Sequence, residues 1–110
     1  EVIINFVGEK TIKELHNKFF NDPSSTDCIS FPMDQKKTKG SYCILGEIFV
    51  CSIVAKKISK HHNHSPHLEM YLYVIHGILH LIGYKDKLSS DIEMMRKKEK
   101  KYLSLIQKII

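Results

Sequence analysis

The sequence predicts one α/β (α+β) domain in which short strands and several helices surround a single central helix. Three observations support this: short runs rich in β-branched and aromatic residues, stretches with apolar residues at helical spacing, and one long segment that is apolar on every side. At 110 residues with 43% hydrophobic content, the chain can form one small core and is too short for two. We therefore treat residues 1–110 as a single domain.

The predicted elements alternate along the chain. The strand-like segments are residues 2–7, 28–31 and 42–51. The segments with helical spacing are residues 11–20, 52–60, 66–82 and a last helix that begins near Ser90. The polar connections are expected at residues 21–25, 34–41 and 61–64. Inside the third strand, Gly46 marks either a bulge or a close approach by another element.

The central helix carries clear start and stop signals. Ser65 is placed to cap its N-terminus, Pro66 fits the first helical position, and Gly83 supplies a left-handed stop at its end. Since apolar residues run all around this helix, we expect it to lie in the middle of the domain.

The last helix is predicted to be amphipathic. Ser90 and Glu93 form a possible capping box at its start. The residues expected to face the core are Ile92, Met95, Tyr102 and Ile106. The basic stretch 96–101 is expected to face water.

Composition indicates a cytoplasmic protein. No run approaches the roughly 18 to 20 apolar residues that a membrane span requires. The three cysteines, Cys28, Cys43 and Cys51, are odd in number and lack CxxC spacing, so neither a disulfide framework nor a thiolate zinc site is indicated. The net charge is +5, and residues 85–108 hold eight Lys and Arg against four acids. This basic segment would favour a polyanionic partner, but on charge alone a solvated helix face is the preferred interpretation.

A metal site is the strongest functional prediction. His76 and His80 lie four residues apart, so both imidazoles project from one helix face and can reach one ion. Gly83 then turns the chain back, and Asp86 follows in the pattern HxxxHxxGxxD. Three protein ligands leave a fourth position for water, as in catalytic zinc sites. The alternative is that each histidine bonds only a carbonyl or a carboxylate.

This pattern is close to the metzincin-like helix and turn HExxHxxGxxH, but Gly77 replaces the glutamate that activates water in those proteases. Peptide hydrolysis is therefore disfavoured. Hydrolysis of a phosphodiester fits better, because a metal ion with nearby cations can stabilise the phosphoryl charge. Lys85, Lys87 and Arg96 are the candidate substrate-binding cations, or else ordinary surface charges.

Three ordered motifs resemble the bacterial YbeY family. They are TDCISFP at 26–32, ILGEIFV at 44–50 and HGILHLIGY at 76–84, against family signatures PTDVLSFP, LLGDIxI and HGxLHLxGYDH. The resemblance covers roughly residues 2–103. It implies a mixed sheet around a metal-bearing helix, and a single-strand-specific, metal-dependent endoribonuclease. The implied role is 16S ribosomal RNA 3′-end maturation and ribosome quality control, with ribosomal RNA and the small subunit as partners.

Carried onto this sequence, the first two family ligands for one divalent ion, expected to be zinc, fall on His76 and His80. The third family histidine falls on Asp86. A carboxylate there should make the bound water less acidic and shift metal preference toward harder ions such as manganese. Glu47 replaces a family aspartate and is a candidate contact to a ligand histidine, or a surface acid at a strand end.

The chain also departs from the family elsewhere. No arginine stands near Phe19, Phe20 and Asn21, where the family usually has one. The cations available instead are Lys18, Lys36 and Lys37. The family generally has another strand and helix before the position that corresponds to Glu1, so an N-terminal portion is expected to precede the chain.

Two alternatives remain. With no general base and no arginine, the chain could be a non-catalytic, metal-stapled ribosome-assembly factor that binds RNA. A second histidine group could also suggest a second metal site, but a polar connection between helices explains it. The histidines of this group are His61, His62, His64 and His67. Neither a membrane nor DNA is expected as a partner.

Overall fold

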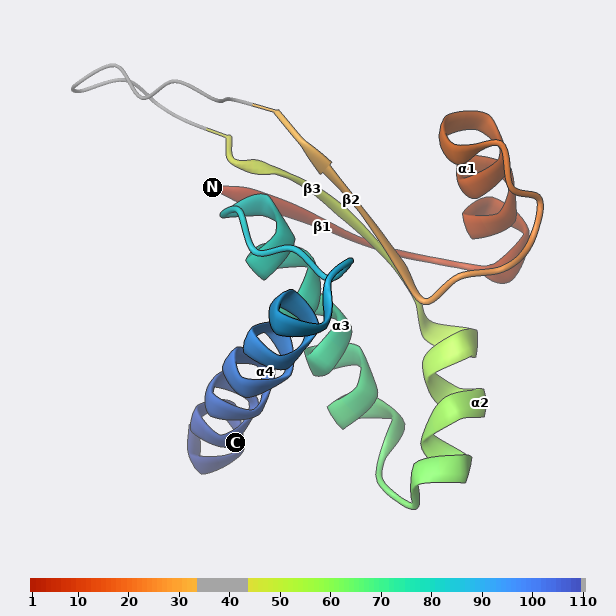
Figure 1. Cartoon of the computed structure of the whole chain (residues 1–110). Coiled ribbons are helices and arrows are strands. Elements are labelled where there is room, and N and C mark those ends of the chain that lie inside the picture. The colour runs from red at the N-terminus through yellow and green to blue at the C-terminus, as the bar shows by residue number, and fades with distance from the viewer. Residues whose placement is uncertain (34–43, 110) are drawn as a thin grey trace.

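The computed structural model describes residues 1–33 and 44–109. The expected connection at 34–41, Cys43, Lys36 and Lys37 lie outside these described residues. In chain order, the elements are β1 (Val2–Val7), α1 (Glu9–Phe20), β2 (Cys28–Pro32), β3 (Gly46–Cys51), α2 (Ser52–His62), α3 (Pro66–Leu81) and α4 (Ser89–Ile109) (Figure 1).

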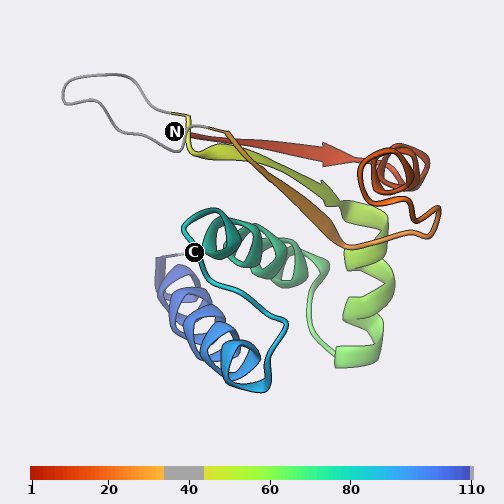
Figure 2. The same cartoon turned by 45° about the horizontal axis from the view of Figure 1, so that its top comes forward.

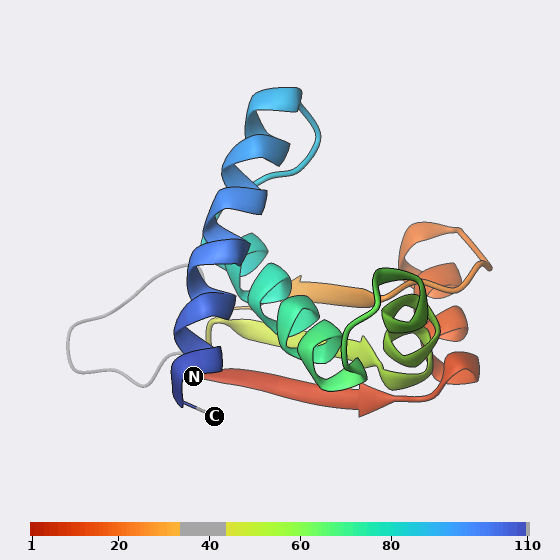
Figure 3. The ribbon, with the colours of Figure 1, turned by 90° about the horizontal axis from the view of Figure 1, so that it is seen from below.

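The three strands form one mixed sheet in the order β1-β3-β2. β1 runs parallel to the central strand β3, and β2 runs antiparallel to it. α3 lies across one face of this sheet, and α4 packs against α3 on the side away from the strands (Figures 2 and 3). The predicted mixed α/β architecture around a central helix is confirmed.

Alternation along β3 divides the core between the two faces of the sheet. Ile48 and Val50 are fully buried and join the cluster that includes Tyr73 of α3. Phe49 points to the opposite face, where it packs in the cluster around the fully buried Ile12 of α1. A third cluster, centred on Met95, joins α4 to α3. The central helix is thus held between the sheet and α4.

Gly46 allows α3 to approach the sheet closely. The strand register passes through Gly46 without interruption, pairing it with Val2 on one side and Pro32 on the other. A Cβ at this position would lie 2.5 Å from a methyl carbon of Leu81 and 2.7 Å from the backbone oxygen of Phe31. The prediction of a close approach is confirmed, and the alternative of a bulge is wrong.

Helix ends differ from prediction in two places. α2 continues through His62 before Asn63 adopts a left-handed conformation (φ 55°) and ends it, so His61 and His62 are helical. α4 begins at Ser89, and the amide of Ile92 donates to the carbonyl of Leu88. The predicted cap at Ser90 is therefore wrong, because the first turn forms one residue earlier.

The exposed and buried faces of α4 also differ from prediction. Met95 is fully buried and Ile106 packs beside it, but Ile92 and Tyr102 are 40% and 39% exposed. Within the stretch expected to face water, Glu99 is only 3% exposed. Its carboxylate is paired with His76 and Arg96.

Among the described residues, no helix is both long enough and apolar enough to cross a membrane.

Candidate metal centre

α3 presents two histidines from one face. The Ser65 hydroxyl accepts from the Leu68 amide and, with Pro66 behind it, fixes where the helix starts, as predicted. One turn apart, His76 and His80 have ring centroids 4.5 Å apart. Their side chains are 18% and 29% exposed, so both rings lie at the edge of the core.

The turn after α3 completes the histidine pair. Gly83 has a φ of 110°, its amide donates to the His80 carbonyl, and the Tyr84 amide donates to the Leu79 carbonyl. These two bonds form a Schellman motif, in which a glycine adopts the left-handed residue at little cost. The predicted stop at Gly83 is confirmed. The reversal carries Asp86 back over the end of the helix.

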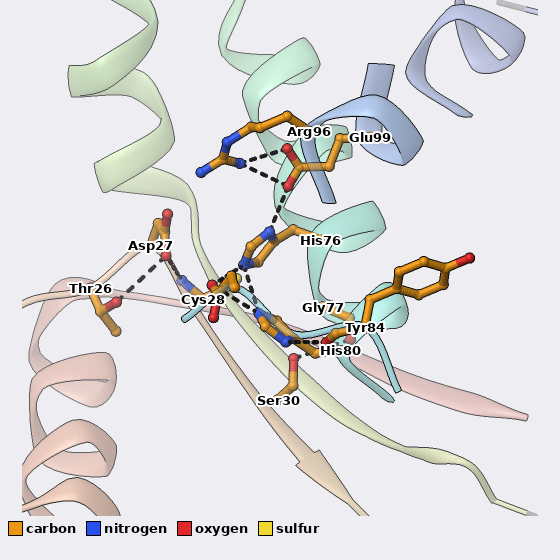
Figure 4. Close-up of polar contacts among 11 residues, drawn as sticks. Thr26, Asp27, Cys28, Ser30, His76, Gly77, His80, Tyr84, Arg96 and Glu99 are labelled. Carbon is orange, nitrogen blue, oxygen red and sulfur yellow. Dashed lines mark hydrogen bonds and ion pairs between the residues drawn. The ribbon is translucent and has the colours of Figure 1, made fainter. Parts of the chain in front are cut away.

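Both imidazoles are oriented by groups that can only accept a hydrogen bond (Figure 4). His80 Nδ1 lies 3.0 Å from the backbone oxygen of Tyr84, and His76 Nδ1 lies 2.6 Å from Oε2 of Glu99. Each Nδ1 must therefore carry the hydrogen, which leaves the lone pair on each Nε2. Metal-binding histidines are usually fixed by such outer partners.

Glu99 is the residue that sequence reasoning missed. It is 3% exposed and also accepts two bonds from Nη1 of Arg96, at 2.6 and 2.9 Å. Burial raises the pKa of the Glu99 carboxyl, but the bonds from His76 and Arg96 outweigh burial and hold this pKa below its usual range. Glu99 lies four residues after the buried Met95, so helical spacing alone places both on one face.

The three predicted ligand atoms converge on one point. His76 Nε2 lies 3.0 Å from His80 Nε2, and Oδ2 of Asp86 lies 3.2 Å from His80 Nε2 and 3.6 Å from His76 Nε2. Zinc–ligand bonds of about 2.0–2.1 Å at tetrahedral angles would place ligand atoms roughly 3.3–3.4 Å apart. The triangle therefore has the size that a tetrahedral ion requires, and these side chains fit the predicted metal.

A cavity of about 560 Å³ opens in front of these ligands. Its walls come from α1, the segment 26–30 and α3, and they include His16, Asp27 and Cys28. Oδ1 of Asp27 accepts from the Cys28 amide at 2.7 Å. Burial, reinforced by the neighbouring Asp27 charge, raises the pKa of the Cys28 thiol. A neutral thiol is a poor metal ligand, whereas the open side of the triangle leaves room for water.

The position after His76 cannot hold a protease glutamate. A Cβ at Gly77 would lie 3.0 Å from two methyl carbons of Ile48 and 3.0 Å from the hydroxyl of Ser30. That hydroxyl also donates to the Gly77 carbonyl at 3.3 Å. Position 77 thus faces the sheet, and a longer side chain there would enter the core.

The remaining sequence candidates lie away from the ligand triangle. Glu47 accepts from the amide of Asn5 at 2.8 Å on the face of the sheet opposite α3, so the expected contact with a ligand histidine is wrong. Glu99 occupies that role instead. Lys85 and Lys87 are exposed on either side of Asp86.

Two cations have more specific surroundings. Arg96 is held by Glu99, although 63% of its side chain stays exposed. Lys18 lies over the ring of Phe19, with Nζ 5.3 Å from the ring centroid. His16, which sequence reasoning also missed, faces the cavity from the helix where the family arginine was expected.

Comparison with known proteins is consistent with this geometry. A family model described as Endoribonuclease YbeY matches residues 1–107. Proteins named Endoribonuclease YbeY from Protochlamydia amoebophila and Chlamydia pneumoniae are 45% and 36% identical to the chain. The alignments cover 99% and 98% of the chain, and 72% and 70% of those proteins. The solution structure of TM1509 from Thermotoga maritima is similar with a TM-score of 0.64 and 33% identity, covering 93% of this chain and 65% of that one.

Proposed function

The chain belongs to the YbeY family of endoribonucleases, and we propose that it hydrolyses single-stranded RNA at one divalent ion, zinc by preference, held by His76, His80 and Asp86. We further propose that its substrate is the 3′ end of 16S ribosomal RNA on the small ribosomal subunit, in the cytoplasm, during maturation and ribosome quality control. The finer part of this proposal rests on the family resemblance.

One observation supports the metal most directly. Two Nε2 atoms, each with its lone pair outward, lie 3.0 Å apart with a carboxylate oxygen 3.2 Å from one of them. Such electron-rich atoms repel one another unless a cation lies between them. A metal ion bound there would polarise a phosphoryl oxygen and lower the pKa of its water to about 7.

In this proposal, residues of the chain orient the metal ligands and accept a proton. Glu99 and the Tyr84 carbonyl orient the imidazoles. Asp27, on the wall of the same cavity, is the carboxylate placed to accept a proton from an attacking water. Asp27 would act as the general base in place of the protease glutamate, whose position is occupied by Gly77.

Phosphate binding requires cations around the cavity. Lys85 and Lys87 flank Asp86 and are free to turn toward a bound strand. His16 stands on the α1 side of the cavity with its Nδ1 bonded to the Ser24 carbonyl at 2.8 Å, so only as an imidazolium can it donate, through Nε2, to a phosphate oxygen. We infer that these residues together bind the RNA phosphates that the family arginine would otherwise contact.

The experiment is cleavage of a labelled single-stranded RNA from the 3′ end of 16S precursor, with the duplex form as a comparison. The protein is stripped with chelator and reloaded with zinc or manganese. We expect activity only after reloading and only on the single strand. His80→Ala should lose the ion of this centre and with it cleavage, while His61→Ala, a change at an exposed α2 residue, should keep both.

Asp27→Asn separates the proton-accepting task from metal binding. We expect it to retain metal and RNA binding and to lower kcat about 10²- to 10⁴-fold. If the zinc-loaded wild-type protein binds the RNA but does not cut it, the proposal fails in favour of a non-catalytic assembly factor. Cleavage by metal-free His80→Ala protein would contradict the metal's role.

A further inference from the structure

The connection between α2 and α3 gathers a second group of potential ligands. Asn63 ends α2 in a left-handed conformation, and its amide and that of His64 both donate to the Ser59 carbonyl. This tight reversal places His62 and His64 beside Glu69, which lies in the first turn of α3. The histidine-rich segment was expected to be only a polar connection, and that interpretation overlooked the carboxylate supplied by the next helix.

This group shares the donor types of the first site but is less evenly spaced, because Glu69 Oε1 and His64 Nε2 are at hydrogen-bond distance and would have to move apart around an ion. Oε1 of Glu69 lies 2.5 Å from His64 Nε2 and 3.5 Å from His62 Nδ1. All three potential ligand atoms lie within 4.8 Å of one another. Two imidazoles and one carboxylate again form the donor set, and this set suits zinc and similar transition-metal ions.

Glu69 carries a charge that its surroundings do not otherwise balance. Its side chain is only 2% exposed, and within residues 1–33 and 44–109 its ion-pair partners are the two histidines alone. The nearby Tyr73 phenol is neutral and cannot balance this charge; burial, followed by the Glu69 carboxylate, raises its pKa. Burying a carboxylate is costly unless a cation is close. A divalent ion shared with His62 and His64 would supply that cation.

We propose that His62, His64 and Glu69 form a second divalent-metal site, of the zinc type, separate from the ribonuclease centre. His76 lies seven positions after Glu69, which corresponds to roughly 10 Å along α3. Ions that act together on one phosphate lie only about 3.5–4 Å apart. The second ion would therefore fasten the α2–α3 connection and would not join the first in one reaction.

The two sites border one cavity of about 580 Å³, whose wall includes His62, Glu69, Tyr73, His76 and Glu99. His62 is 61% exposed and forms the outer edge of the proposed site, so an ion can enter from solvent. A bound ion would also add positive charge at the end of the cavity away from Asp86, where buried carboxylates otherwise dominate.

The test counts bound ions. Wild-type protein is dialysed against a buffer with a fixed concentration of free zinc. The number of zinc ions per chain is then measured by inductively coupled plasma mass spectrometry. We expect two ions in the wild type and one in His62→Ala. His61→Ala is the matched control, since it removes the neighbouring exposed histidine, and it should keep two. Because His62 is largely exposed, its replacement should leave the fold intact, as circular dichroism would verify.

A cobalt experiment isolates the second site. In His80→Ala protein, we expect one Co²⁺ per chain with visible absorption bands, and we expect the added change Glu69→Gln or His62→Ala to remove them. If His62→Ala binds as many ions as the wild type, or if His80→Ala shows no cobalt bands, the second site is refuted. Loss of the ribonuclease centre alone would leave these bands unchanged, so the two proposals can fail independently.

Discussion

Replacing Glu99 with glutamine tests whether the buried carboxylate tunes the metal centre. Glu99 lies 2.6 Å from His76 Nδ1, and glutamine keeps its shape while removing its charge. Loss of such an outer partner typically weakens metal binding about 10- to 100-fold, or roughly 1.4–2.8 kcal/mol. We expect zinc affinity to fall by this factor, because a neutral amide raises the basicity of His76 less than a carboxylate does.

The same change should destabilise the metal-free protein. A hydrogen bond to a charged group contributes about 1.5–3 kcal/mol, and Glu99 makes its bond to His76 at 3% exposure. Its pair with Arg96 adds less, about 0.2–1 kcal/mol, because that side chain is 63% exposed. Because the glutamine oxygen can still accept a neutral hydrogen bond worth about 0.5–1.5 kcal/mol, we expect the free energy of unfolding to fall by about 1–2.5 kcal/mol, most of it from the weakened bond to His76.

Zinc affinity is measured by competition with a chromogenic chelator, and stability by urea unfolding without metal. Glu93→Gln is the matched control, since it removes the same charge from an exposed position on α4. Arg96→Gln should lower zinc affinity less than Glu99→Gln does. The reasoning is refuted if Glu99→Gln binds zinc as tightly as the Glu93→Gln control.

Four further predictions each concern a single position. Gly46→Ala should lower the free energy of unfolding by about 1–3 kcal/mol, because the new Cβ meets a backbone oxygen at 2.7 Å. Gly8→Ser, at the N-cap of α1 with nothing within 4 Å of the new Cβ, should leave the free energy of unfolding nearly unchanged. Both variants are measured by urea or thermal unfolding. Asp86→His should raise the preference for zinc over manganese in a competition assay, and an unchanged preference would contradict Asp86 as a ligand. Cys28, whose thiol pKa is raised by burial, should resist iodoacetamide at pH 8 until the protein is unfolded, as peptide mass spectrometry would show.

Local sequence signals were enough to predict most of the fold. The strands, the central helix and its cap at Ser65 all depend on spacing and turn chemistry within a few residues. His76 and His80 share a helix, so helical periodicity alone places their rings together. Asp86 is reached through one glycine turn, which is still a local event. These residues could be predicted because each relation spans ten residues or fewer.

What sequence reasoning missed depends on contacts between elements. Glu99 reaches His76 across 23 positions and looks, in sequence, like one acid in a lysine-rich solvated face. Glu47 had the better motif, but the pleat of β3 turns it away from α3 toward Asn5. Side-chain direction within a strand changes with every residue, so a motif match cannot decide which face a side chain occupies until the register is known.

The charge around the cavity leads us to expect that a metal ion binds before RNA. The wall of the 580 Å³ cavity carries four carboxylates, Asp27, Glu69, Asp86 and Glu99, against the single guanidinium of Arg96. A phosphate entering this space without an ion would meet net negative charge, so the chain's overall +5 can attract RNA to the protein but cannot by itself seat it. Each divalent ion bound by two neutral imidazoles and one carboxylate leaves one positive charge in the cavity. Each ion therefore removes two negative charges from the cavity as well as supplying chemistry, and we expect RNA affinity itself to depend on metal.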